Sequence, residues 1–188
     1  NLGLTRQAVD IIPWAATGGA RGPPSSIALL GDGTGMFSVL DPSSQVLYTT
    51  DFELASGPSG MDMTNVVQIQ DQVFVASGDL IDVFNSTAWR WTDPLTGFGQ
   101  DIVSMVTDGT LIYLATESPA SILELDPDGT WLRIWGGVDL AQDEVLDLAY
   151  DNTGYLVATH LGEVTVIDLI TGGSSYYTWD VGRFNDVV

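Results

Sequence analysis

The side chains of this chain that could serve as general acids, general bases or metal ligands are mainly carboxylates, and a single histidine accompanies them. With His160 alone and no cysteine, the chain lacks the usual ligands of a zinc site and offers little material for a serine–histidine triad. A glycosidase needs only two opposed carboxylates, and 25 acidic residues leave such a pair open without singling one out. The residue types therefore favour a protein that is not an enzyme, without deciding the question.

One pair of carboxylates has the spacing of a calcium loop. Asp126 and Asp128 lie two positions apart and precede Gly129. The downstream glutamate of a calcium-binding helix–loop–helix is absent, and Asp-Gly is also the pair that a tight hairpin favours. We therefore expect a hairpin here and no firmly bound cofactor, with weak calcium binding by this pair as the alternative.

The charge balance is strongly acidic. Twenty Asp and five Glu oppose five Arg and no Lys, for a net charge of −20. Such a field repels nucleic acid and anionic membranes, so neither is an expected partner. No apolar run approaches the roughly 20 residues of a membrane-spanning helix, so no membrane insertion is expected. Because counterions relieve self-repulsion, we interpret the surface as adapted to a saline (halophilic) environment.

An apolar segment that ends in a small hydroxyl residue recurs along the chain. It occupies Val73–Ser77, Leu111–Thr116 and Tyr155–Thr159, with a weaker copy at Ile27–Leu30. Each copy is followed by a second apolar segment that ends at an Asp or Asn, and these end positions are spaced by 44, 41 and 42 residues. The end positions are Asp41, Asn85, Asp126 and Asp168. A period of this length indicates a repeat architecture.

Each repeat predicts four strands. A short apolar segment precedes the two segments above and an aromatic segment follows them, with turns such as Asp108-Gly109 and Asp128-Gly129 between. No helical periodicity is sustained. We therefore predict an all-β protein, a β-propeller of four-stranded antiparallel blades. The predicted blades span residues 4–54, 60–93, 100–136 and 143–180, and residues 181–188 form a closing strand or the first strand of a further blade.

Four units leave the closure of the ring open. The chain starts without Met and stops within an apolar pattern, so we expect it to be a portion of a longer polypeptide. It is then a fragment of a larger propeller, or half of an eight-bladed ring made by a homodimer. A two-chain ring would pair every exposed strand edge by symmetry.

The fourth unit carries a recognisable repeat pattern. Residues 143–172, with Asp151, Gly154, Thr159, Gly162 and Asp168 at its marked positions, resemble the repeat of two-component-regulator propellers. The stretch Asp168–Gly172 followed by Tyr176 is also similar to the docking motif of quinoprotein-like propellers, with Tyr where that family has Trp. The resemblance implies propeller blades and says little about function.

We expect a non-catalytic propeller module for recognition or assembly, belonging to a larger surface or secreted protein, with a protein or a second copy of itself as partner. Two alternatives stay open: a ligand-sensing propeller of a signalling protein, and a propeller lyase or glycoside hydrolase that uses carboxylates. If a ligand face exists, it is expected on the loops between second and third strands and on those that link blades. These loops carry Asp32, Asp79, Asp93, Glu117, Asp139 and His160.

Overall fold

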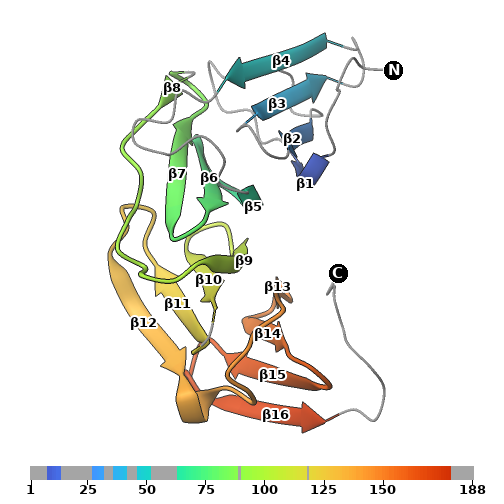
Figure 1. Cartoon of the computed structure of the whole chain (residues 1–188), viewed down its shortest axis with the longest axis vertical. Coiled ribbons are helices and arrows are strands. Elements are labelled where there is room, and N and C mark those ends of the chain that lie inside the picture. The colour runs from blue at the N-terminus through green and yellow to red at the C-terminus, as the bar shows by residue number, and fades with distance from the viewer. Residues whose placement is uncertain are drawn as a thin grey trace. The chain divides into compact units, whose positions relative to one another are not determined.

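The computed structural model describes residues 8–13, 27–31, 36–41, 46–51, 63–88, 90–117 and 119–178. Side-chain burial is defined for residues 64–88, 90–117 and 119–178. The chain divides into two compact units, Asn1–Gly97 and Phe98–Val188. The described part of each unit consists of antiparallel strands (Figure 1), apart from a short 3₁₀ turn, η1 (Gly137–Asp139).

The first unit contains two four-stranded sheets. The strands of its first sheet are β1 (Ala8–Pro13), β2 (Ile27–Gly31), β3 (Met36–Asp41) and β4 (Val46–Asp51). Those of its second sheet are β5 (Met63–Ile69), β6 (Gln72–Ser77), β7 (Leu80–Asn85) and β8 (Arg90–Trp91).

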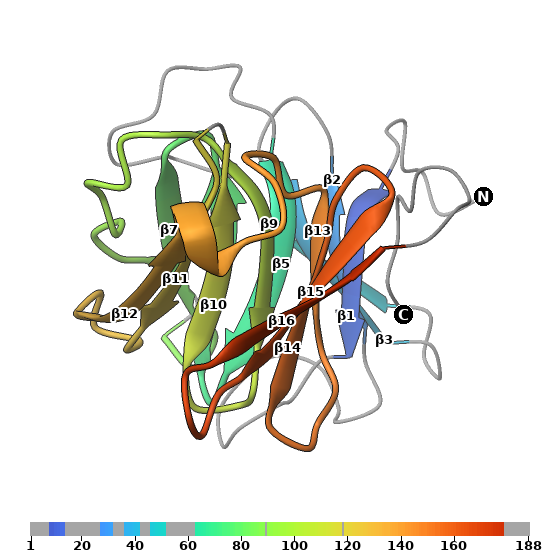
Figure 2. The same cartoon turned by 90° about the horizontal axis from the view of Figure 1, so that it is seen from below.

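The second unit repeats this arrangement. Its first sheet has strands β9 (Ile102–Thr107), β10 (Ile112–Thr116), β11 (Ser121–Leu125) and β12 (Trp131–Gly136). Its second sheet has strands β13 (Asp147–Tyr150), β14 (Tyr155–Thr159), β15 (Glu163–Asp168) and β16 (Ser174–Thr178). Figure 2, seen from below, has β16 of this last sheet in front.

Every strand in the four sheets pairs only with the strands before and after it in the sequence. The predicted all-β fold of four-stranded antiparallel units is therefore confirmed. Within the described residues no helix is long and apolar enough to cross a membrane.

Local side-chain chemistry explains why the strands turn where they do. The Asp108 carboxylate accepts hydrogen bonds from the backbone amides of Thr110 and Leu111, both at 2.7 Å, and Gly109, between Asp108 and Thr110, has φ of 90°. Asp151 accepts from the amides of Thr153 and Tyr155 in the same way. A short acidic side chain thus supplies the acceptors that the turn backbone would otherwise lack.

The second unit has a continuous apolar core that involves both of its sheets. Eleven buried residues form it: Tyr113, Ala115, Ala120, Ile122, Trp135, Leu140, Val145, Leu148, Leu156, Ala158 and Ile167. A polar link lies beside it, because the Ser104 hydroxyl on β9 donates to the Asp147 carboxylate at 2.6 Å and accepts from the Leu148 amide at 3.1 Å.

The two sheets of this unit differ in how their faces are covered. All five residues of β10 are buried, as are four of the five in β11, so this sheet is covered on both faces. In β15, Thr165 and Ile167 are buried whereas Val164 and Val166 are only half-buried. The last sheet therefore has one covered face and one apolar face that is partly exposed, which we call the valine face; Val157 of β14 belongs to it.

Candidate functional site: an arginine clamp and an exposed outer strand

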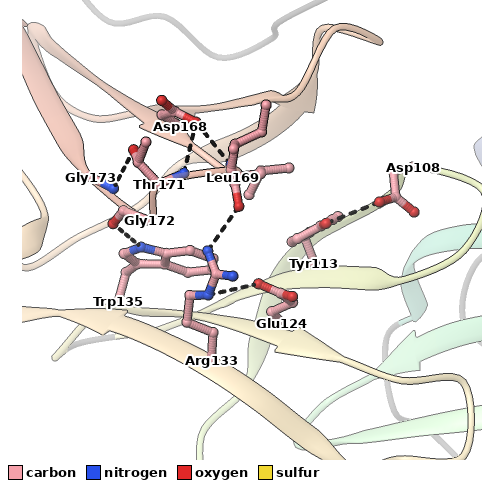
Figure 3. Close-up of polar contacts among 11 residues, drawn as sticks. Asp108, Tyr113, Glu124, Arg133, Trp135, Asp168, Leu169, Thr171, Gly172 and Gly173 are labelled. Atoms are coloured by element: carbon pink, nitrogen blue, oxygen red, sulfur yellow. Dashed lines mark hydrogen bonds and ion pairs between the residues drawn. The ribbon is translucent and has the colours of Figure 1, made fainter.

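Arg133 of β12 lies at the centre of a group of polar contacts that joins the two sheets of the second unit (Figure 3). Its Nε atom lies 3.4 Å from Glu124 Oε2 on the neighbouring strand β11. Its Nη1 atom donates to the carbonyl oxygen of Leu169 at 3.0 Å, and the guanidinium carbon lies 5.2 Å from the centroid of the Trp135 ring. The Arg133 guanidinium therefore forms an ion pair, donates a hydrogen bond to a carbonyl oxygen and makes a cation–π contact.

The β15–β16 turn completes this group. Trp135, 3% exposed, donates from Nε1 to the carbonyl oxygen of Gly172 at 3.0 Å. Asp168 holds the turn by accepting from the amides of Ile170 and Thr171, and hydrogen bonds from the Thr171 amide and hydroxyl lower the pKa of Asp168. We call Glu124, Arg133, Trp135, Leu169 and Gly172 the arginine clamp, because together they fasten β12 to the turn of the next sheet.

Burial, hydrogen bonds and neighbouring charges shift the pKa values of the ionisable groups beside the clamp. Burial raises the pKa of Glu124, Arg133 opposes this shift and the charge of Asp108 adds to it. The Tyr113 hydroxyl donates to Asp108 at 3.1 Å, and burial followed by the Asp108 charge raises the pKa of Tyr113. Burial acts to raise the pKa of Asp108, but hydrogen bonds from Leu111, Thr110 and Tyr113 outweigh it and lower that pKa. The tyrosine is therefore held neutral and is not an activated nucleophile.

The other side of β12 faces outward. Trp131, Leu132 and Ile134 are 45%, 50% and 51% exposed, and we call these three residues the outer-strand surface. A register shift between Glu124 and Leu125 sets Trp131 opposite Leu125, so that Leu132 has no partner position on β11. The Trp131 ring stacks on buried Phe98, with centroids 6.2 Å apart and planes 6° apart.

The last strand of the last sheet also exposes large rings, from its two tyrosines. Tyr176 and Tyr177 of β16 are 46% and 55% exposed, and the Tyr176 hydroxyl donates to the Val138 carbonyl. Val138, just after β12, is 91% exposed. In the second unit, exposed large apolar side chains therefore gather on both terminal strands.

Five of the six predicted ligand-face residues lie in described segments. Asp79 and Glu117 are exposed in the β6–β7 and β10–β11 turns. Asp93 follows β8 and is exposed, and Asp139 lies half-buried in η1. Asp32 lies outside the described residues. Within the second unit, no hydrogen bond or ion pair joins Glu117, Asp139 and His160 to one another, and the ligand role of all six residues stays a prediction.

His160 follows β14 but is fully buried instead of reaching an exposed surface. Its Nδ1 lies 2.6 Å from the Glu144 carbonyl oxygen and its Nε2 lies 2.8 Å from Thr165 Oγ1. Because a carbonyl oxygen can only accept, Nδ1 carries the proton and Nε2 of a neutral ring accepts from the Thr165 hydroxyl. The hydroxyl oxygen accepts in turn from the Ala141 amide at 3.0 Å, so His160 anchors the segment that leads into β13.

The Asp126–Gly129 segment is a closed hairpin turn. The Gly129 amide donates to the Asp126 carbonyl at 2.8 Å, and the Thr130 amide donates to the Asp128 carboxylate at 2.8 Å. Hydrogen bonds from the Thr130 hydroxyl and, to a smaller extent, from the Thr130 amide lower the pKa of Asp128. No group of three or more His, Asp or Glu suited to a metal ion occurs in the part of the chain that the structure describes. Calcium binding by the pair stays a prediction.

One buried carboxylate did not emerge from the sequence patterns. Asp82 of β7 is 7% exposed, and its Oδ2 atom has no hydrogen-bond partner among the described residues. The strand registers set it opposite Val75, the position that Leu123 and Val166 take in the later sheets. Burial raises the pKa of Asp82 to about 6. The sequence does contain a signal for a buried carboxylate here, because Asp82 interrupts an otherwise apolar strand.

Comparison with known proteins finds likeness in fold alone. No family model and no curated protein matches the sequence. Among solved structures, WD40 repeats of RRP9 match 96% of this chain with a TM-score of 0.68 at 16% identity. WD40 repeats form four-stranded propeller blades. The chain has a β-propeller fold.

Two further solved structures agree with this assignment. A structure of U3-55K matches 96% of the chain with a TM-score of 0.67 at 15% identity. A chain of the mitotic checkpoint complex matches 86% with a TM-score of 0.68 at 12% identity. This chain spans 58% of the length of the first two neighbours and 49% of the third, so it corresponds to about half of each.

Proposed function

We propose that this chain is a non-catalytic propeller module for recognition or assembly of proteins. The observation that carries the proposal is the exposure of large apolar side chains on β12 and β16, the terminal strands of the sheets in the second unit. Tryptophan and tyrosine at such positions are typical of the residues that contribute most to protein–protein contacts. The charges of Arg133 and Glu124 in the arginine clamp are paired with each other, and the Trp135 ring nitrogen donates to the turn of the next sheet, which supports a role in holding the strands.

The acidic composition supports a proposal about the environment in which this module works. A net charge of −20 without a single lysine favours a saline environment, in which counterions screen the repulsion within the chain. We therefore propose a surface or secreted protein of such an environment. We also propose that the chain is related to two-component-regulator or quinoprotein-like propellers. The pattern of the fourth unit supports this relationship.

Self-assembly is the form of this function that we favour first. The valine face of the last sheet is apolar and only half-buried, and propeller blades normally cover both faces of each sheet with neighbours. A second copy of the chain, packed on this face, would complete a ring. The greater length of the structural neighbours supports a need for further sheets.

The native mass of the purified chain at low and high salt tests this proposal. We expect a dimer, near twice 20.1 kDa, at high salt and a shift toward monomer at low salt, because repulsion between two chains of −20 grows as screening falls. Tyr177→Asp places a charge beside the valine face and should abolish the dimer. Leu161→Asp, at a residue of similar exposure in the β14–β15 turn, should not. A monomer at every salt concentration would contradict self-assembly.

A further inference from the structure

The outer edge of β12 has the features of an open pairing site. β12 ends its sheet and, within the described residues, pairs only with β11. Native edge strands are usually protected by outward charges, by proline, by a bulge or by a covering segment. β12 has a bulge only at Leu132, and its residues from Arg133 to Gly136 pair with β11 in regular register. Here the one charged side chain of the strand, Arg133, is turned into the clamp, and Leu132 and Ile134 are left half exposed.

This edge is held in place before any partner arrives. Phe98 fixes the Trp131 ring at one end, and the hydrogen bond from Trp135 to Gly172 fixes the other. An ordered edge loses little conformational freedom on binding, which favours addition of an extended strand.

The negative charges near both ends of β12 favour one kind of partner. Asp126 and Asp128 precede β12 and Asp139 follows it, whereas Arg133 is paired with Glu124. A second copy of this chain, also at −20, would bring more negative charge to the same place. A segment with lysine or arginine at both ends would instead meet carboxylates at both ends of the strand.

We propose that β12 receives an extended, basic-ended segment of a partner protein as a fifth strand of its sheet. Six residues of extended chain span roughly 20 Å, so the segment carries a short apolar centre that covers Leu132 and Ile134, flanked by basic side chains. This inference rests on the proposed recognition function and names the chemistry of one partner. It does not depend on self-assembly through the valine face.

The probe is a fluorescently labelled synthetic peptide of roughly ten residues, with alternating valine and threonine in the centre and lysines at both ends. Binding to the full chain is followed by anisotropy at low salt. Ile134→Lys and Leu132→Lys each place a charge on the edge and should weaken binding about tenfold or more. Leu161→Lys adds the same charge at a similarly exposed residue of the β14–β15 turn and should bind like wild type. Circular dichroism confirms that each variant is folded.

Two further readouts complete the test. A peptide with glutamates in place of the lysines should not bind, and hydrogen exchange should slow at β12 amides when the lysine peptide is present. Equal binding by Ile134→Lys, Leu132→Lys and Leu161→Lys would mean attraction to the acidic surface in general and would overturn the proposal, as would unchanged exchange at β12. The dimer mass measured separately would be unaffected, so the two proposals fail independently.

Discussion

The guanidinium of Arg133 donates a hydrogen bond to the carbonyl oxygen of Leu169, which lies 36 positions further along the chain, at 3.0 Å. The same guanidinium lies beside Glu124 and over Trp135. It therefore joins the last strand of one sheet to the last turn of the next.

Replacing Arg133 with methionine should destabilise the second unit by about 2 kcal/mol, because buried Glu124 loses its counterion and Leu169 its donor. Urea unfolding measures the loss. Arg90→Met, at an exposed residue of β8, is the matched control and should change stability little. Equal effects of the two substitutions would show that the clamp adds no stability.

Alanine substitutions at Gly172 and Gly109 can be compared to distinguish backbone strain from a steric contact with the clamp. Both have positive φ, 77° and 90°, so alanine at either costs about 1 kcal/mol. A Cβ atom at Gly172 would also lie 3.3 Å from Arg133 Nη1, whereas nothing lies within 4 Å of one at Gly109. We expect Gly172→Ala to be the more destabilising in thermal unfolding. The reverse order would place Arg133 away from the turn in solution.

Asp82 should make the stability of the first unit depend on pH. Its folded pKa, about 6, exceeds the ordinary 3.8, so the folded state binds the proton more tightly than the unfolded state. The cost of the buried charge is full above about pH 6 and disappears as the pH falls toward 4. Asp82→Leu, which installs the residue type found at Leu123, should add about 2 to 3 kcal/mol at pH 8 and much less at pH 4.

Urea unfolding of wild type and Asp82→Leu across this pH range provides the measurement. Asp79→Asn removes a charge from an exposed turn of the same unit and serves as control. A gain from Asp82→Leu that is the same at pH 4 and pH 8 would show that Asp82 is not charged and buried in the folded chain.

The His160 anchor should depend on one hydroxyl. Thr165→Val leaves the Ala141 amide and His160 Nε2 without their partner, and we expect a loss of about 2 kcal/mol and faster hydrogen exchange at Ala141. Thr178→Val, at an exposed residue of β16, is the control. Unchanged exchange at Ala141 would contradict the role assigned to the hydroxyl.

The strands and turns were predictable because their causes are local. Asp108 with Gly109, and Asp151 with Gly154, shape turns through bonds to amides within four residues. Short continuous apolar segments between these turns then indicate the strands. These local rules were sufficient for the four-stranded units and the fold class.

The candidate site was less predictable because its causes are distant. Trp131 and Trp135 lie in the same aromatic segment of the repeat, yet Trp135 is buried and Trp131 is 45% exposed. The register shift at Leu125 that separates them has no local signature. His160 likewise owes its burial to Glu144 and Thr165, which no spacing rule connects to it.

The strict pairing of each strand with its sequence neighbours has a consequence for how the chain forms. Among the described strands, no sheet needs a segment from a distant part of the chain, so loop closure within each sheet is short and folding is expected to be fast for an all-β protein. We expect contacts between sheets, such as that from Ser104 to Asp147, to form after the sheets themselves. A chain of this kind can gain or lose a whole sheet in evolution by duplication or deletion while the remaining strands keep their partners.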